Sequence, residues 1–449
     1  MNYILKKPIF WLAVAVFAVS VSYSFYFQIK PAVDAKAYDR IAQNIVSGEG
    51  YRESLDVPIE KDNSIVRVGP GYEFFLAGVY QVFGRNLPAV WVIHAFLLSL
   101  ASVFVYLASL KIFSELDEKR KEIASLASAA LVGFSPDLVT ISGMIMSETL
   151  AVFLIALSVF LFFDYLTGGR KSIWRMFALF LSLGFLAMVR TPAAFLALPV
   201  FFYFLSERRW KELVFGALVI AALFSPWVYR NYKIYGAFVP TNLAYGVDLL
   251  FGNHQGASGE LEHYDLPYEN IKKYGYAEGN KENAKEALRF VVDNPLEFLK
   301  ITFYRVSIYF SFARPTGFWF HLEGLSKVAT LALSALYSAL VFILGFLGAS
   351  FMGQLKEDKR AAKYLLAMAA LMPVSVMFIA VETRYRFPIY PLLAVFAGYA
   401  VSDFVYDWRG WKGWKLQNAL IAVFILLANT GFDGLRNLSV IFEKLNDLR

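Results

Sequence analysis

The chain has 449 residues, of which 58% are apolar and 17% aromatic, while only 18% are charged; its mean hydropathy is +0.50. This composition excludes an ordinary water-soluble protein, which carries more charge and fewer apolar runs. The net charge of +7 lies in short loops between apolar segments, which argues against nucleic-acid binding. The absence of cysteine excludes disulfides and thiolate chemistry.

Apolar stretches near the roughly 20 residues needed to cross a bilayer recur along the whole chain. We therefore predict an all-α, multi-pass membrane protein forming one membrane domain over residues 1–449. The first stretch lacks a small-residue cleavage site and is predicted to stay as an anchor. The eleven predicted spans are Ile9–Phe27, Leu87–Lys111, Ile123–Ile141, Thr149–Tyr165, Trp174–Val189, Ala193–Leu205, Leu213–Tyr229, Leu325–Phe351, Tyr364–Val381, Pro388–Val405 and Leu416–Phe432.

Basic residues in the short loops orient these spans. If the spans alternate, every basic cluster falls on one side, which the positive-inside rule predicts to be cytoplasmic. Two long loops, residues 30–86 and 230–324, then lie on the extracytoplasmic side, and long loops tend to carry function. The basic clusters are Lys6-Lys7, Lys119-Arg120-Lys121, Arg170-Lys171, Arg208-Arg209-Lys211, Lys356-Lys359-Arg360 and Arg409-Lys412-Lys415.

The first long loop opens with an acidic segment. Helical periodicity over Lys36–Val46 puts Asp34 and Tyr38 on one face. A carboxylate near a helix start is favoured electrostatically, so Asp34 fits a helix cap as well as a catalytic carboxylate. Further along, Gly69 and Gly71 flank a proline, which predicts either a structural turn or a backbone lip over a ligand cavity.

Other charged residues are predicted on the same membrane face as Asp34. Each arginine taken singly fits a snorkelling anchor, but four of them on the extracytoplasmic side suggest that an anion such as a lipid phosphate is held there. An extended turn after residue 381 would point Arg384 and Arg386 the same way. The residues concerned are Glu148, Arg190, Arg230, Glu382, Arg384, Tyr385 and Arg386.

The second long loop has a helical pattern near Lys281–Val292 and an aromatic stretch, Phe298–Phe320, that we expect to lie along the interface because Arg305, Arg314 and Pro315 interrupt it. We expect His94 to be buried and structural. The cluster formed by His254, Glu260, Glu262, His263 and Asp265 matches no zinc pattern, so we predict no cofactor, although a divalent cation held by carboxylates and water stays open.

Taken together, these pieces resemble membrane glycosyltransferases of the GT-C fold, in the branch of the dolichyl-phosphate-mannose protein mannosyltransferases and the bacterial aminoarabinose transferases. The chain departs from several mannosyltransferases in having Asp34-Ala35 where they carry Asp-Glu. The matching segments are Asp34 with Tyr38, Ala42 and Gly48-Glu49-Gly50, Gly69-Pro70-Gly71 with Phe83-Gly84, Ser147-Glu148, Arg190-Thr191-Pro192, Pro226-Trp227 with Arg230-Asn231-Tyr232 and Gly236, Asn294-Pro295, and Arg384-Tyr385-Arg386-Phe387-Pro388.

The resemblance implies inverting transfer of a sugar from a polyprenyl-phosphate donor to a hydroxyl of a glycolipid, glycan or protein, at the extracytoplasmic face of the plasma membrane. It implies that Asp34 is the catalytic base. Arginines would stabilise the departing phosphate, and Glu148 would border the sugar or acceptor pocket.

Two other functions compete with this interpretation. A transporter or flippase of a lipid-linked saccharide would also use arginines and aromatic residues near a lipid phosphate, but its charges are expected near the bilayer midplane and its halves are expected to repeat. An oligosaccharide polymerase or ligase would use a lipid-diphosphate donor.

Overall fold

The computed structural model describes residues 7–67, 69–168, 172–262, 264–313, 319–353 and 359–438. These residues form helices and turns without a strand, which confirms the all-α prediction; one isolated β-bridge joins Glu260 and Val381. Among the residues named above, Lys6, Arg170, Lys171, His263, Arg314, Pro315 and Lys356 lie outside the described ranges.

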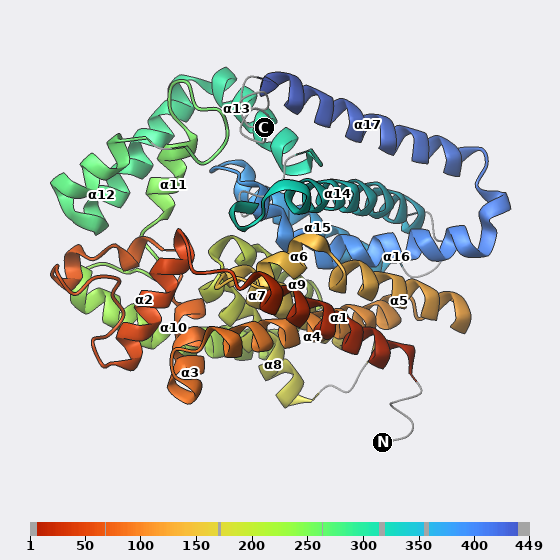
Figure 1. Cartoon of the computed structure of the whole chain (residues 1–449), viewed down its shortest axis with the longest axis horizontal. Helices are drawn as coiled ribbons and strands as arrows, with labels where there is room; N and C mark the ends of the chain where they lie inside the picture. Colours follow the sequence, from red (N-terminus) through yellow and green to blue (C-terminus); the bar gives the residue numbers. More distant parts are fainter. Residues whose placement is uncertain are drawn as a thin grey trace.

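The described residues of the first half of the chain form ten α-helices and three 3₁₀-helices (Figure 1). They are α1 (Pro8–Phe27), α2 (Asp34–Val46), η1 (Ile59–Lys61), η2 (Asn63–Val66), α3 (Pro70–Phe83), α4 (Leu87–Ile112), α5 (Glu118–Gly133), α6 (Pro136–Ser142), α7 (Ser147–Leu166), α8 (Ile173–Val189), η3 (Thr191–Leu196), α9 (Ala197–Ser206) and α10 (Trp210–Tyr235).

The second half continues with seven α-helices and three 3₁₀-helices among its described residues. They are α11 (Tyr245–Gly252), α12 (Leu266–Asp293), α13 (Pro295–Phe310), η4 (Trp319–His321), α14 (Gly324–Met352), α15 (Arg360–Met377), η5 (Thr383–Ile389), α16 (Tyr390–Asp407), η6 (Trp408–Gly410) and α17 (Trp414–Arg436).

Each predicted span coincides with a helix or a pair of helices. Eight helical segments of the described chain are long and apolar enough to cross a membrane. A ninth candidate is the pair α5 and α6, which is bent by 49°. The elements of the two remaining predicted spans, Ile173–Val189 and Thr191–Ser206, are shorter apolar helices. The chain is therefore multi-pass in character, and the count of eleven stays a prediction.

Proline explains two of the helix breaks. Pro136 starts α6, and the residue before a proline is disfavoured in the helical region, so α5 ends and the chain bends there. Pro192 ends α8 in the same way and leaves a 3₁₀ turn before α9. Pro226 does not end its helix: it lies inside α10, which continues to Tyr235. The predicted end of this span at Tyr229 is therefore six residues too early.

The core lies where α16 packs against α5 and α14 and where α4 packs against α7. Small residues allow these helices to approach closely. A Cβ on Gly398 would lie 2.1 Å from Ser128 Oγ, and a Cβ on Gly348 would lie 1.8 Å from the Phe396 carbonyl oxygen. His94 is buried in α4, as predicted, and its ring lies 3.3 Å from the Tyr72 hydroxyl.

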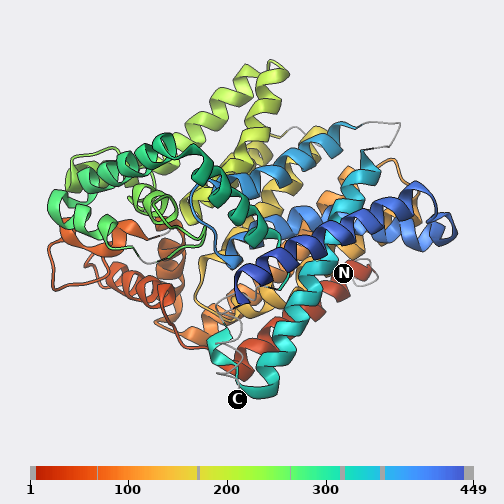
Figure 2. The same ribbon diagram turned by 90° about the horizontal axis from the view of Figure 1, so that it is seen from above.

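The two long loops gather at one end of the molecule. Figure 1 shows α2, α11 and α12 there, and Figure 2 shows the long helices α14 and α17 extending away from that end. The loops are joined directly: the amide of Leu243 donates to the carbonyl of Ile65 at 2.8 Å, and the Tyr276 hydroxyl bonds Asn63. The predicted helix at Lys281–Val292 is the second part of α12, which is kinked at Gly275.

Candidate active site

Asp34 is the first residue of α2 and lies between two guanidinium groups. Its Oδ2 is 2.9 Å from Nη1 of Arg384, and its Oδ1 is 3.9 Å from Nη1 of Arg67. The preceding residue, Val33, has a φ of 50°, which is strained for a β-branched residue. The carboxylate is 20% exposed, so it faces a partly solvated space rather than closed protein.

A buried ion pair lies beside this group. Oε1 of Glu148, at the start of α7, is 2.9 Å from Nη1 of Arg190, which caps the end of α8. Arg384 Nη1 lies 3.9 Å from the same oxygen, so it contacts both Asp34 and Glu148. The Tyr385 ring completes the cluster, with the Arg190 and Arg384 guanidinium carbons 5.2 and 5.8 Å from its centroid. Four elements far apart in sequence thus converge.

Tyr38 closes the cluster on the side of α2. It lies one helical turn after Asp34, on the predicted shared face, and is 1% exposed. Its ring packs edge-on against Tyr72 at 5.4 Å, and its hydroxyl has no hydrogen-bond partner among the described residues. Burial, followed by the negative charge of Asp34, raises the pKa of Tyr38 well above its ordinary value. The phenol is therefore neutral.

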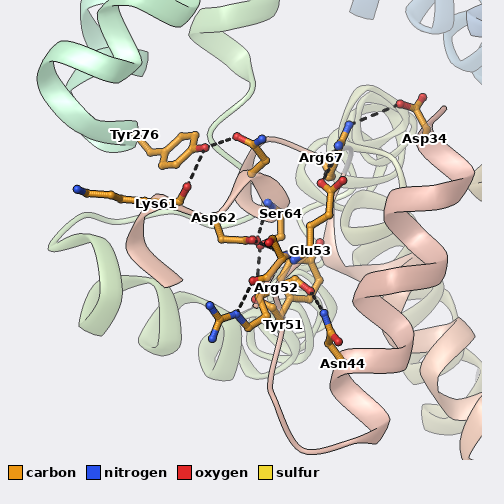
Figure 3. A network of polar contacts seen from close by, with 12 residues as sticks. Asp34, Asn44, Tyr51, Arg52, Glu53, Lys61, Asp62, Ser64, Arg67 and Tyr276 are labelled. Carbon is orange, nitrogen blue, oxygen red and sulfur yellow. Dashed lines mark hydrogen bonds and ion pairs between the residues drawn. The ribbon is translucent and has the colours of Figure 1, made fainter. Parts of the chain in front are cut away.

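Arg67 is a member of the site that sequence reasoning missed. Figure 3 shows it between Asp34 and Glu53, whose Oε2 is 2.6 Å from Arg67 Nη2. Burial opposes the charge of Arg67, but the hydrogen bond to Glu53 and the nearby carboxylates raise its pKa overall. Arg67 precedes the Gly-Pro-Gly turn by two residues, and this closeness in sequence is the one feature that could have identified it as a site residue.

The loop that carries Arg67 is held by Asp62. The Asp62 carboxylate accepts backbone N–H groups of Glu53 and Ser54, each at 2.8 Å, and of Ser64 at 3.0 Å (Figure 3). Burial alone would raise the pKa of Asp62, but the hydrogen bonds from Ser64 and from the backbone outweigh it and lower the pKa. The loop is therefore fixed by a charged carboxylate.

Two further acids near the site were also missed. Glu73 on α3 is fully buried, and burial raises its pKa to about 8. Asp248 on α11 has its pKa raised to about 7, first by burial and then by the charges of Glu382 and Asp34. Neither residue belonged to a recognisable motif, and only the fold brings them near Asp34.

Arg386 lies apart from the cluster. The segment is a 3₁₀-helix rather than an extended turn, so residues two apart point in different directions, and the expectation that Arg384 and Arg386 point the same way is wrong. Arg386 is fully buried, 3.7 Å from Asp137 and bonded to the Ser311 carbonyl at 2.8 Å. The structure therefore places it in the core and not beside Asp34.

Arg230 also lies apart from the ion-pair cluster. It donates to the carbonyl of Tyr51 at 2.7 Å and stacks over the Trp227 ring at 4.8 Å. The glycines of the turn pack against α8: a Cβ on Gly69 would lie 2.4 Å from the Met188 carbonyl oxygen, and one on Gly71 would lie 2.7 Å from the Val189 nitrogen. This packing accounts for both glycines as a structural turn, and their role as a lip stays a prediction.

In the described part of the chain, no group of three or more His, Cys, Asp or Glu side chains is arranged to hold a metal ion. The acids around Asp34 are instead spaced by guanidinium groups: Arg67 separates Asp34 from Glu53, and Arg384 separates it from Glu148 and Glu382. In such an arrangement, the anion of a ligand can replace a carboxylate as the partner of Arg67 or Arg384.

Comparison with known sequences gives one family. The family model for dolichyl-phosphate-mannose-protein mannosyltransferase matches residues 12–227, slightly less than half of the 449 residues. This range includes Asp34, Glu148 and Arg190 but not Arg384. No curated protein sequence matches the chain.

Solved structures give the fold. The oligosaccharyltransferase of Archaeoglobus fulgidus, solved with Zn and sulfate, is 16% identical with a TM-score of 0.50, over 94% of this chain and 52% of that one. Its apo form is 15% identical with a TM-score of 0.50, over 93% and 54%. ArnT from Cupriavidus metallidurans bound to undecaprenyl phosphate is 15% identical with a TM-score of 0.41, over 88% and 78%.

The chain thus spans about half the length of the oligosaccharyltransferase. At this identity the likeness concerns the fold alone. The chain has the GT-C fold of membrane glycosyltransferases, and over its first half it resembles the dolichyl-phosphate-mannose-protein mannosyltransferase family.

Proposed function

We propose that the protein is a glycosyltransferase that moves a sugar from a polyprenyl-phosphate donor to a hydroxyl acceptor, with inversion, at the extracytoplasmic face of the membrane. One observation carries the proposal: a partly exposed carboxylate, Asp34, lies 2.9 Å from Arg384 and 3.9 Å from Arg67. The family model supports the lipid-phosphate donor, because the family is named for one.

The reaction needs one base for the acceptor hydroxyl and positively charged groups that bind the departing phosphate. The acceptor hydroxyl gives its proton to the Asp34 carboxylate while its oxygen forms a bond to the anomeric carbon. The bond from that carbon to the phosphate oxygen breaks, and the lipid phosphate leaves with the electron pair. A lipid phosphate is already a good leaving group, so the second negative charge that it gains as the bond breaks needs stabilisation rather than a general acid.

Arg384 has a double role in this proposal. In the structure it pairs with Asp34 at 2.9 Å. A bound donor phosphate competes for the same guanidinium. When Arg384 and Arg67 turn to the phosphate, the Asp34 carboxylate is free to accept the proton of the acceptor hydroxyl. Donor binding therefore frees the base for the acceptor.

The Glu148–Arg190 pair forms the buried, rigid side of the site. Its carboxylate is fully buried, and Arg190 is 6% exposed, so neither side chain is free to move far. Through the 3.9 Å contact to Arg384, Glu148 holds that guanidinium near Asp34. Tyr38, neutral and without a hydrogen-bond partner among the described residues, offers a hydroxyl to the sugar or acceptor.

The test is transfer from a radiolabelled polyprenyl-phosphate sugar by purified protein in detergent, where no sealed membrane exists. Asp34→Asn should lower the rate by about 10²–10⁴-fold, because it removes the base but keeps the shape. Asp56→Asn, an exposed acid of the same loop, is the matched control and should leave the rate unchanged. Near-normal turnover by Asp34→Asn would remove this residue from the base role.

The donor is tested separately. A panel of polyprenyl-monophosphate and polyprenyl-diphosphate sugars, with products followed by mass spectrometry, distinguishes a monosaccharide transferase from a polymerase or ligase. Turnover of the monophosphates alone is expected. Turnover of the diphosphates alone would refute the proposed donor, and binding without turnover of any donor would favour a transporter.

A further inference from the structure

A cleft separate from the Asp34 site opens where α1 ends and α4 begins. It has a volume of about 590 Å³ and is lined by residues of three segments: the end of α1, the turn after α3 and the start of α4. The lining residues that matter for its chemistry are Phe25, Lys30, Phe83, Arg85 and Trp91.

The cleft lies on the other side of α2 from the proposed active site. Arg85 donates through Nε and Nη2 to Asp39, with Nη2 at 2.7 Å, whereas Asp34 pairs with Arg384. Asp39 comes five residues after Asp34, about 140° further around the helix. A ligand in the cleft therefore does not compete with one bound at Asp34.

One end of the cleft is cationic and poor in acceptors. Lys30 is exposed and forms no ion pair within the described residues. Arg85 binds Asp39 through Nε and Nη2, and its Nη1 forms no hydrogen bond within the described residues. The indole Nε1 of Trp91 also lacks a partner among the same residues, but this atom is buried and not accessible from the cleft. Two donor groups without an acceptor, the Lys30 ammonium and Arg85 Nη1, thus border the cleft.

The other end of the cleft is apolar and faces outward. Phe25 and Phe83 are 43% and 55% exposed, and the Trp91 ring packs edge-on against Phe25 at 5.7 Å. Both α1 and α4 are candidate membrane spans. The apolar lining belongs mainly to the ends of these helices, while the polar lining follows or precedes them. The cleft therefore straddles the boundary between hydrocarbon and headgroups.

We propose that this cleft binds the headgroup of an anionic phospholipid from the surrounding bilayer. Its phosphate accepts hydrogen bonds from Lys30 and Arg85, and its acyl chains lie against Phe25 and Phe83. An anionic lipid fits better than a zwitterionic one because Lys30 brings a positive charge that the protein does not neutralise. The proposal is independent of the proposed function.

The experiment is native mass spectrometry of the purified full-length protein, titrated with phosphatidylglycerol or phosphatidylcholine of equal chain length. Phosphatidylglycerol should bind about tenfold more tightly, the size expected for one charge-assisted hydrogen bond. Lys30→Gln should abolish that preference. Lys36→Gln removes an equal charge from an exposed position of α2 outside the cleft and should keep it.

Three results would overturn the proposal: equal binding of the two lipids, an equal loss in Lys30→Gln and Lys36→Gln, or displacement of the lipid by excess inorganic phosphate. The last would show that the cleft binds a free anion rather than a lipid.

Discussion

Removing the charge of Glu148 should destabilise the protein strongly. The change Glu148→Gln keeps the size of the side chain but leaves the guanidinium of Arg190 buried without its anion. The two groups are 2.9 Å apart, with side chains 0% and 6% exposed, so water cannot replace the lost partner. Breaking one half of a buried pair costs about 3–5 kcal/mol. Arg384 does not add to this cost, because it keeps Asp34 and Glu382.

The assay is thermal unfolding of the purified protein in detergent, followed by tryptophan fluorescence. An unfolding entropy of roughly 2.1 cal/mol/K per residue converts this cost to a fall in Tm of about 3–5 °C. The double variant Glu148→Gln/Arg190→Gln should lose much less than the sum of the two single variants, since it leaves neither charge unpaired.

Glu297→Gln provides the control. Glu297 pairs with Lys300 at 3.1 Å, but these side chains are 34% and 53% exposed, and solvent-exposed pairs contribute at most about 1 kcal/mol. The reasoning is refuted if Glu148→Gln lowers Tm no more than Glu297→Gln, or if the effects of Glu148→Gln and Arg190→Gln simply add.

Three further predictions concern the first long loop. Gly71→Ala should lower Tm because its Cβ meets the α8 backbone at 2.7 Å, whereas Gly78→Ala on the same helix, with nothing within 4 Å, should be neutral or stabilising; equal melting would contradict this packing. Glu73 has a folded pKa of about 8, above its unfolded value, so the protein should lose stability as the pH rises from about 4.5 to 8, and Glu73→Gln should flatten this dependence in melting curves; an unchanged slope would argue against a neutral Glu73. Asp62 has a lowered pKa, so its stabilising effect is present above its ordinary pKa of 3.8 and is lost as the pH falls through the folded value; hydrogen-exchange protection factors over residues 51–67, which correct for the intrinsic pH dependence of exchange, should fall on acidification in the wild type and be low at every pH in Asp62→Asn.

Much of the fold could be predicted from local sequence patterns. Apolar length alone located the helices, and Pro192 correctly marked the end of α8. The span that contains Pro226 was predicted to end at Tyr229, but α10 continues to Tyr235, because a proline is tolerated inside a long apolar helix when its surroundings supply the packing. Pro136 has the opposite effect: the chain bends between α5 and α6, which were predicted as one span, and the residue type alone does not distinguish the two cases.

The site was partly predictable. Helical periodicity put Tyr38 beside Asp34, and the common membrane face grouped Glu148, Arg190 and Arg384, which the structure brings together. Arg67 was not found, because its contact with Asp34 depends on the course of an irregular loop fixed by Asp62. Arg386 was misplaced, since an error in local conformation between extended and 3₁₀ redirects a side chain completely.

The ion pair between positions 34 and 384 has a consequence for biosynthesis. Translation proceeds from the N-terminus, so the ribosome makes Asp34 some 350 residues before its partner. A nascent chain therefore lacks the closer of the two guanidinium partners of Asp34 through most of membrane insertion, and the cluster around this carboxylate is complete only when η5 is in place. Truncated products of this polypeptide should consequently be inert, whatever sugar carriers the membrane holds.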